Sequence, residues 1–585
     1  MVLEYIPKRR LTMLAGKKQL TEIFTNGRAL EIPFFQRGYV WTEDLWERLL
    51  DDLLSICESE EPHFIGSIIL KQKRTETRSG VSEIRTVVDG QQRLTSLMLL
   101  LKALLLYKGE IRVFDRQFRT FDDKISLWHN RNDKEEFEYV MSLETVDLIE
   151  EKSNISKAYN YFVNYLVNNS ETAKLDFDKI VRNLWFVSID LDDNEDEQLI
   201  FDTINSLGVQ LGPHELLKNY FFDRNDEQKF DDIWVKIFEA DDDVRSYWNE
   251  EIKATNKTQS VIEIFFHSYL TIKINEPSYD VPNRVKNIFS KREQLFKSYK
   301  KFIKDYQGNR PNDLLQDLAS YALIFRDTFN ANIVNEELPF SDYGTERLNL
   351  IIFGLGYTVL IPYVLYMEKN ISCQNDKREM FEVLESYMIR RILSGTQNKG
   401  YDALFNDTML TKQILSRKDF LAEVSTRGDG LNFPDDDMVS QGVKSKKLTS
   451  KYALGILYLM ETKLRNNDRY TTQTLSMNKY SIEHVMPKKW EQHWALPSTR
   501  NDIERHSKIQ LLGNLTLLTQ SLNKAVSNRN WESKKNGSGA YGGLYKYAAS
   551  LETFSTFLQE PYWDEEVIDK RSEFLIEKAL TVWRK

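Results

Sequence analysis

Two neighbouring residues in the C-terminal third of the chain have side chains suited to acid–base and metal chemistry. They are Glu483 and His484, and Pro487 follows them closely. A neutral imidazole takes a proton from water near pH 7, so His484 is a candidate general base. Glu483 offers a carboxylate oxygen, the ligand type that Mg²⁺ or Mn²⁺ prefers. The pair predicts half of a one-cation site for phosphodiester hydrolysis, although a lone histidine in a strand is more often structural.

Further residues of suitable type lie downstream of this pair. The segment 513–515 reads Gly-Asn-Leu and enters a predicted short strand, and Asn523 follows in a predicted helix. Asn523 offers a carbonyl oxygen as a second cation ligand. The amide of Asn514 is suited to tying backbone groups together, which would hold the histidine strand against the helix. Two β elements and a helix are the smallest scaffold for a one-metal site.

The position of the pair along its strand decides whether both residues can serve one site. Adjacent residues of a strand point to opposite faces of the sheet. Glu483 and His484 can therefore share a site only at a strand end or a bulge. Pro487 favours a strand end at this point, because proline cannot donate to a sheet ladder.

Positive charge is concentrated around the same residues. From position 441 to 550 the chain has 18 Lys and Arg against 7 Asp and Glu, a local balance of +11. The whole chain carries −9, so the remainder carries −20. A basic module on an acidic body predicts contact with a polyanion confined to that module. A solvated basic face explains the charge equally well.

This C-terminal pattern resembles the His-Me finger (HNH) nucleases. The sequence EHVMP followed by LLGNLTLLTQSLN is similar, more closely, to the nuclease domain of GmrD-type proteins. The resemblance implies a ββα-metal fold and cleavage of double-stranded DNA, with His484 and Asn514 in the catalytic centre and Glu483 and Asn523 on Mg²⁺ or Mn²⁺. Phosphate contacts would then fall to the basic side chains Lys488, Lys489, Arg529, Lys534 and Lys535.

A second group of polar residues lies near the N-terminus, in two short motifs. The motif IPFFQRGYVW forms a non-periodic loop before a helix, and VVDGQQRL places a glycine turn at a helix entrance. Backbone N–H groups at such an entrance favour anions. Arg93 could pair with phosphate, Asp89 could hold Mg²⁺ or orient water, and the two glutamines could bind sugar or base. A buried polar network that holds the loop to the sheet explains the same residues equally well.

These motifs, with FDTINSLGVQLGPHELLKNYFF at 201–222, resemble the N-terminal domain of GmrS-type proteins. The resemblance implies a ParB/sulfiredoxin-like α/β fold that binds and hydrolyses a nucleoside triphosphate. Whether this is GTP, ATP or another nucleotide stays open. The implied nucleotide-binding residues are Gln36, Arg37, Tyr39, Asp89, Gly90, Gln91, Gln92, Arg93, Asn205 and Lys218.

A chain of 585 residues is too long for one hydrophobic core. The patterns predict an α+β, multidomain protein with a mixed α/β domain at 1–223, an α-helical middle domain at 224–433 and the nuclease domain at 434–585. Strands are expected at 64–70, 83–88 and 183–191, the first two as a hairpin, with a long buried helix after the DGQQR motif. The stretch 427–447 is rich in Gly, Pro, Asp and Ser, which favours a linker.

The cellular setting is predicted from cysteine use and hydropathy. The chain has two cysteines, far apart, and no apolar signal region at its start, which fits a reducing cytoplasm. The segment 348–367 carries no charge over a membrane-spanning length, but it contains two glycines and a proline. A buried helix or helix pair is expected there, with membrane contact as the alternative.

Both resemblances in one polypeptide, in this order, look like a fused GmrSD-type enzyme, a modification-dependent (type IV) restriction endonuclease acting in phage defence. The N-terminal domain would sense modified DNA or nucleotide state, and the C-terminal domain would cut. Two alternatives stay open: a modification-independent abortive-infection nuclease, and a nucleotide-switched DNA-binding regulator. The sequence leaves the modification, the effect of nucleotide hydrolysis and the oligomeric state open, a homodimer included.

Overall fold

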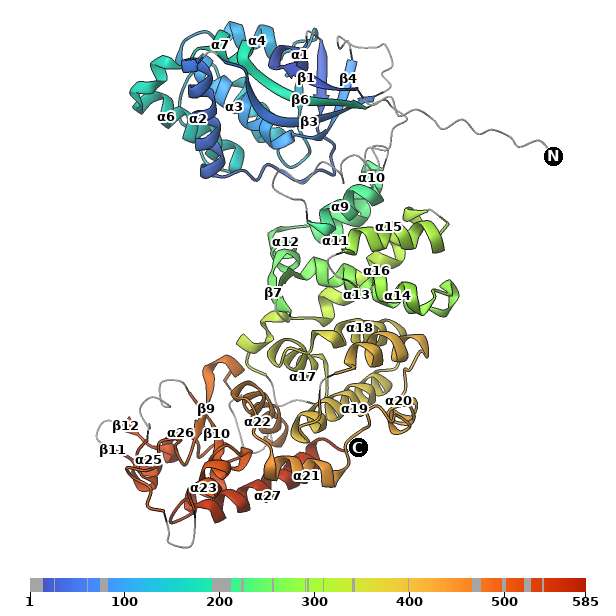
Figure 1. The fold of residues 1–585 in the computed structure, drawn as a ribbon, viewed down its shortest axis with the longest axis vertical. Helices are drawn as coiled ribbons and strands as arrows, with labels where there is room; N and C mark the ends of the chain where they lie inside the picture. The colour runs from blue at the N-terminus through green and yellow to red at the C-terminus, as the bar shows by residue number, and fades with distance from the viewer. Residues whose placement is uncertain are drawn as a thin grey trace, which may run out of the picture. The chain divides into compact units, whose positions relative to one another are not determined.

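The computed structural model describes most of the chain (Figure 1). It divides into two compact units, residues 1–232 and 233–585, and each unit is considered by itself below. The predicted boundaries near 223 and 433 stay a prediction. The described residues are 14–25, 27–59, 61–73, 81, 83–191, 212–222, 226–254, 257–289, 291, 294–308, 310–338, 342–397, 399–465, 475–496, 501–519, 528–538 and 541–585.

The first unit is built on a six-stranded mixed sheet with the order β1-β6-β3-β4-β2-β5. Strand β3 pairs antiparallel with β4 and parallel with β6, so the predicted hairpin and the third predicted strand are confirmed. The strands are β1 (Leu14–Gln19), β2 (Arg28–Glu31), β3 (His63–Lys73), β4 (Glu83–Asp89), β5 (Leu127–Trp128) and β6 (Leu184–Leu191).

Helices pack on one face of this sheet around the leucine-rich helix α3, which directly follows the DGQQR glycine turn (Figure 1). Leucines lie on every side of α3, so it is buried nearly all round, as predicted. On the opposite face, Ile69, Val88 and Ile189 form a small cluster with Leu216 of α9. The helices are α1 (Leu20–Ile23), α2 (Glu43–Ser59), α3 (Gln91–Tyr107), α4 (Ile111–Phe118), α5 (Lys134–Ser142), α6 (Asn154–Asn168), α7 (Phe177–Asn183), α9 (Pro213–Phe221) and α10 (Glu227–Lys229).

The second unit begins with helices, as predicted for the middle of the chain, and with one small ribbon of β7 (Glu251–Ala254) and β8 (Lys257–Ser260). Its core is rich in aromatic side chains such as Phe265, Tyr269 and Tyr387. The helices up to residue 425 are α11 (Lys236–Phe238), α12 (Asp242–Asn249), α13 (Val261–Asn275), α14 (Asn283–Phe289), α15 (Leu295–Tyr306), α16 (Leu315–Thr328), α17 (Thr345–Asn349), α18 (Ile361–Asn370), α19 (Gln374–Leu393) and α20 (Arg417–Ser425).

The uncharged segment 348–367 lies inside this helical core. It forms the end of α17, a π-helical turn at Leu350–Gly354 and the first two turns of α18. Gly356 has a positive φ of 87° and interrupts the segment, and Pro362 stands in the first turn of α18, where proline is tolerated. Buried helices are confirmed here. Within the described ranges no helix is both long enough and apolar enough to cross a membrane.

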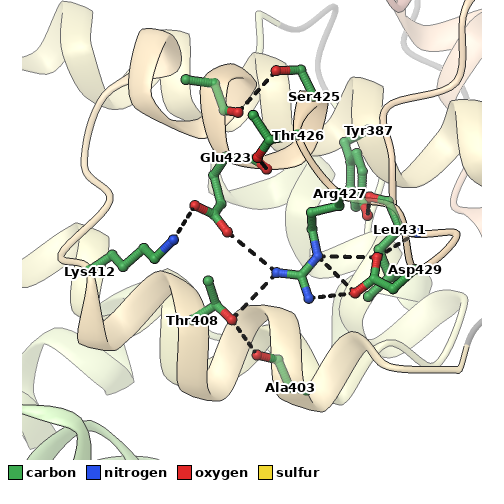
Figure 2. Close-up of polar contacts among 11 residues, drawn as sticks. Tyr387, Ala403, Thr408, Lys412, Glu423, Ser425, Thr426, Arg427, Asp429 and Leu431 are labelled. Carbon is green, nitrogen blue, oxygen red and sulfur yellow. Dashed lines mark hydrogen bonds and ion pairs between the residues drawn. The ribbon is translucent and has the colours of Figure 1, made fainter.

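The expectation of a linker at 427–447 is wrong, because this stretch is bound to neighbouring helices. Arg427 donates to both carboxylate oxygens of Asp429 at 2.6–3.2 Å and reaches Thr408 and Glu423 at 3.5 and 3.4 Å (Figure 2). Tyr387 donates its hydroxyl to Leu431 O at 2.8 Å. Asp and Pro here act as turn and cap residues.

The same stretch continues directly into a helix. Arg390 and Arg391 of α19 bind the carbonyls of Pro434 and Gly430, each at 2.9 Å. Asp435 then caps α21, accepting from Met438 N at 2.8 Å. Residues on both sides of 433 therefore belong to one packed unit.

The C-terminal part of the second unit carries a two-stranded ribbon surrounded by helices. Strand β9 (Tyr480–His484) pairs antiparallel with β10 (Leu515–Thr519), so the two predicted β elements are present. The helix expected to contain Asn523 lies outside the described residues, and the His-Me finger and ParB-like folds stay predictions. The other elements are α21 (Asp436–Ser445), α22 (Ser450–Leu464), α23 (Asp502–Ile509), the 3-10 turn η12 (Leu512–Asn514), α25 (Trp531–Asn536), β11 (Gly537–Ser538), β12 (Tyr541–Gly542), α26 (Leu544–Tyr547) and α27 (Glu565–Val582).

Candidate active site

His484 is the last residue of β9 and pairs with Leu515 at the start of β10. Its ring is half-buried and makes no hydrogen bond within the described ranges. Burial, followed by the positive charges of Lys488, Lys534 and Lys447, lowers its pKa to about 4. The imidazole is therefore neutral near pH 7 and has a nitrogen lone pair that can accept a proton.

Glu483 is buried and forms an ion pair with a lysine from a helix. The Lys534 ammonium donates to Glu483 Oε1 at 2.5 Å and to the main-chain oxygen of His484 at 2.9 Å. Burial raises the pKa of Glu483 and lowers that of Lys534, and in each case the partner's charge opposes the shift. The predicted strand end is present, because β9 stops at His484.

Asn514 is fully buried and uses its whole carboxamide to hold the loop after β9. Its Nδ2 donates to Met486 O at 2.8 Å and to Ile509 O at 3.0 Å. Its Oδ1 accepts from Met486 N at 2.8 Å and from the Trp563 indole at 3.0 Å. These four bonds are those of a loop-fixing residue, and they leave Asn514 no donor or acceptor for a cation.

The turn before β10 is held from the other side by α27. Arg571 is buried and donates to Gly513 O at 2.8 Å and Leu512 O at 3.2 Å. A Cβ on Gly513 would lie 2.2 Å from Ser572 Oγ and 2.4 Å from Ile568 O, so only glycine fits. No local pattern indicates these partners, because they follow Gly513 by more than fifty residues.

Of the two predicted cation ligands, Glu483 is described and Asn523 lies outside the described residues. Within the described ranges, no group of three or more His, Cys, Asp or Glu is placed to hold a metal ion.

The predicted phosphate contacts fall into three groups. Lys488 and Lys489 are exposed directly after the histidine strand. Arg529 and Lys535 are half-buried, and Lys535 donates to Glu560 O at 3.3 Å. Lys534 is the exception: its side chain is 0% exposed and bound to Glu483, so the expected phosphate contact is not supported.

Of the lysines around His484, sequence reasoning missed Lys447 and expected Lys534 to contact phosphate. Lys447 is exposed and near enough to lower the histidine pKa. The expected phosphate contact of Lys534 overlooks that it follows the buried Trp531 by three positions. This spacing puts Trp531 and Lys534 on the same, inward side of α25, and it is the sequence pattern that could have indicated the burial of Lys534.

In the first unit, the DGQQR motif forms the junction between β4 and α3. Asp89 ends the strand, and Gly90 caps the helix with a φ of 100°, a conformation that favours glycine. Arg93 Nη2 binds Asp89 Oδ2 at 3.1 Å. A Cβ on Gly66 would lie 2.6 Å from Arg93 Nη1, so the guanidinium crosses β3 at this glycine.

The glutamines of this motif hold the preceding loop. Gln91 Nε2 donates to Arg37 O at 3.1 Å. Gln92 donates to Gly38 O at 3.0 Å and accepts from Val40 N at 2.9 Å. Both polar atoms of the Gln92 carboxamide are thus used within the fold, so its expected contact with sugar or base is not supported. In Gln91 the Oε1 atom is still available to a ligand, since it is buried without a hydrogen bond among the described residues.

Two further residues of the predicted pocket are also used within the fold. Gln36 is buried and donates to Val88 O at 3.4 Å. Tyr39 is a core residue: its hydroxyl contacts Ser96 Oγ at 2.5 Å and accepts from the Trp46 indole at 2.8 Å. Burial raises the pKa of Tyr39 well above its usual value. A nucleotide contact by its hydroxyl is not supported.

The remaining predicted residues lie on or near α9. Arg37 Nη1 is 3.8 Å from Glu215 Oε2, which links the loop to this helix. Lys218 is a buried residue of the same helix, and Asn205 lies outside the described residues. The fold thus brings together Asp89, Gly90 and Arg93 with the 36–40 loop.

Both ends of the chain match known families of DNA-cleaving restriction enzymes. Residues 20–222 match the N-terminal domain of the GmrSD restriction endonuclease, and residues 434–578 match the GmrSD restriction endonuclease C-terminal domain. The two matches together cover more than half of the chain and define a DNA endonuclease of the type IV restriction class. The chain belongs to the GmrSD restriction endonuclease family. No curated protein matches it.

Proposed function

We propose that the chain cuts double-stranded DNA with a His-Me finger (HNH) site in which His484 is the general base. The observation that carries this proposal is a neutral, half-buried imidazole at a strand end, with no hydrogen bond from its ring in the described part of the chain. His484 accepts a proton from water, which then attacks the phosphorus of the scissile phosphodiester. Lys447 and Lys488 attract the DNA backbone to that position.

The cofactor in this proposal is Mg²⁺ or Mn²⁺, held by Glu483 and Asn523. The donor chemistry fits, because Oε2 of Glu483 is not part of the ion pair with Lys534, and such cations need few protein ligands besides water. A bound divalent cation supplies charge stabilisation at the phosphate and its leaving oxygen. Asn514 holds the loop that follows His484 by binding the main chain of Met486.

The N-terminal unit is proposed to bind and hydrolyse a nucleoside triphosphate that regulates cutting. The polar groups that support this are the Asp89 carboxylate, the Arg93 guanidinium and the first turn of α3 after Gly90. Arg93 Nε and Gln91 Oε1 are buried without hydrogen bonds in the described part of the chain, which is typical of a site that receives a polar ligand. The proposed biological role is restriction of modified phage DNA.

Lysines beside His484 are expected to contact DNA phosphates. The measurement uses a His484→Ala background, which should slow cutting. There Lys447→Ala/Lys488→Ala should make the slope of log affinity against log salt concentration less steep by about 1.8, since each phosphate contact contributes roughly 0.9. Lys301→Ala/Lys304→Ala removes two exposed charges from α15 and should leave the slope unchanged. An unchanged slope in the first pair would remove both lysines from the DNA interface.

The proposed function is tested by a cleavage panel with the full chain. Unmodified DNA is compared with DNA carrying glycosylated hydroxymethylcytosine, other base modifications or phosphorothioates, with each nucleoside triphosphate and with Mg²⁺ or EDTA. Cleavage is expected only of a modified DNA, with Mg²⁺ and a nucleotide that is turned over. Cleavage of unmodified plasmid would instead support an abortive-infection nuclease, and tight binding without metal-dependent nicking would support a DNA-binding regulator.

A further inference from the structure

A fully buried lysine stands directly behind the candidate site. Lys534 lies on α25 with 0% of its side chain exposed, and its ammonium binds both Glu483 Oε1 and the main-chain oxygen of His484. Burying an ammonium is costly unless it is paired and hydrogen-bonded. Lys534 is buried and bound to the two residues proposed to do the chemistry. Its position therefore fits neither a solubilising charge nor a phosphate contact.

The two bonds of this ammonium fix different parts of the strand end. The bond to Oε1 sets the side-chain direction of Glu483, and the bond to the carbonyl sets the peptide plane that follows His484. Neighbouring residues of a strand point to opposite faces, so an anchor that contacts both residues at the end of β9 determines their mutual geometry. Errors of about 1 Å in such geometry cost about 10²-fold in rate.

The anchor is itself held rigidly. Asn530 caps α25 by accepting from Ser533 N at 2.9 Å, and the Trp531 indole donates to Glu560 O at 3.0 Å. Trp531 also packs against Trp563, with ring centroids 5.0 Å apart. Trp563 in turn donates to Asn514, which binds Met486. Residues 483–486 are therefore held by Lys534 at one end and by Asn514 at the other.

We propose that Lys534 is a positioning residue of the nuclease: it holds Glu483 and the backbone of His484 in their working arrangement and leaves Oε2 of Glu483 for the cation. This inference rests on the proposed function of His484. It assigns to Lys534 a role inside the protein, in contrast to the DNA-facing role of Lys447 and Lys488.

A double-mutant cycle read by thermal unfolding tests the contact without relying on cleavage. Lys534→Met leaves the buried Glu483 carboxylate without its counter-charge and should lower Tm by roughly 5 °C. In a Glu483→Gln background the same substitution should lower Tm by less than half as much. Equal losses in both backgrounds would overturn the proposal. If Lys534→Met does not fold, Lys534→Gln, which keeps an N–H donor but no charge, completes the same cycle.

Kinetics then separate positioning from general stability. Well below the variant's Tm, Lys534→Met should lower kcat by about 10²-fold and change KM for DNA by less than about 2-fold. The matched control is Lys273→Met, which breaks an ion pair with Glu276 and Asp317 at 2.7 and 2.8 Å in the helical region and should lower Tm without lowering kcat. A normal kcat in Lys534→Met would refute the positioning role.

The two proposals fail in different ways. Full cleavage by His484→Ala would end the assignment of the base, whatever the unfolding cycle shows. An additive unfolding cycle, with cleavage lost in His484→Ala, would remove only Lys534 from the site.

Discussion

His484→Ala is expected to lower the rate of DNA cleavage by about 10²–10⁴-fold, the usual contribution of a general base. The substitution removes the half-buried imidazole that has no hydrogen bond among the described residues and a pKa of about 4. The loss should appear in the single-turnover rate constant with supercoiled plasmid, measured by the appearance of nicked and linear forms.

The variant should keep its fold and its affinity for DNA, because the alanine keeps the backbone that binds Lys534. His506→Ala is the matched control: His506 is exposed on α23, its ring lies 5.8 Å from that of Trp490, and its removal should leave cleavage unchanged. Full activity in His484→Ala would show that another group activates the water.

Asn514→Asp is expected to destabilise the second unit by about 3 kcal/mol or more, although it preserves shape. The carboxamide donates to two buried carbonyls and accepts from two buried N–H groups. A carboxylate oxygen in place of Nδ2 would face the carbonyls of Met486 and Ile509, which are acceptors and cannot pair with it. The midpoint of urea unfolding, followed by tryptophan fluorescence, measures the loss.

Asn332→Ala provides the comparison, since Asn332 is exposed and its side chain donates to Glu250 at 2.8 Å. The Asn332→Ala substitution should lower the free energy of unfolding by less than about 1 kcal/mol. If Asn514→Asp lowered the free energy of unfolding no more than this control, the four buried bonds would not be what stabilises the loop at residues 485–486.

Local patterns in the sequence were sufficient for much of the fold. The β3–β4 hairpin, β6 and the leucine-rich α3 follow from runs of β-branched or leucine residues bounded by turn signals. The strand end at His484 follows from Pro487, and the loop-fixing role of Asn514 follows from its side-chain chemistry. Each of these depends on residues close together in the chain.

Expectations were less accurate where the outcome depends on contacts between residues far apart in the chain. The 427–447 stretch has linker composition, but arginines of α19 bind its carbonyls. The second glutamine of the DGQQR motif is used by backbone groups of the 36–40 loop, which composition alone could not distinguish from a ligand contact. Lys534 was expected to contact phosphate, but it is buried and paired with Glu483, 51 residues earlier in the chain. Asn205 and Asn523 lie outside the described residues and stay predictions.

The β9–β10 ribbon depends on residues from late parts of the chain. A two-stranded ribbon is marginally stable alone. Here its ends are supported by Trp563 and by Arg571 of α27, both well after the last residue of the motif itself. A short fragment that spans only the finger motif would lack both supports. A transfer of this ribbon into another protein is therefore expected to need Trp563 and α27 as well, as one block.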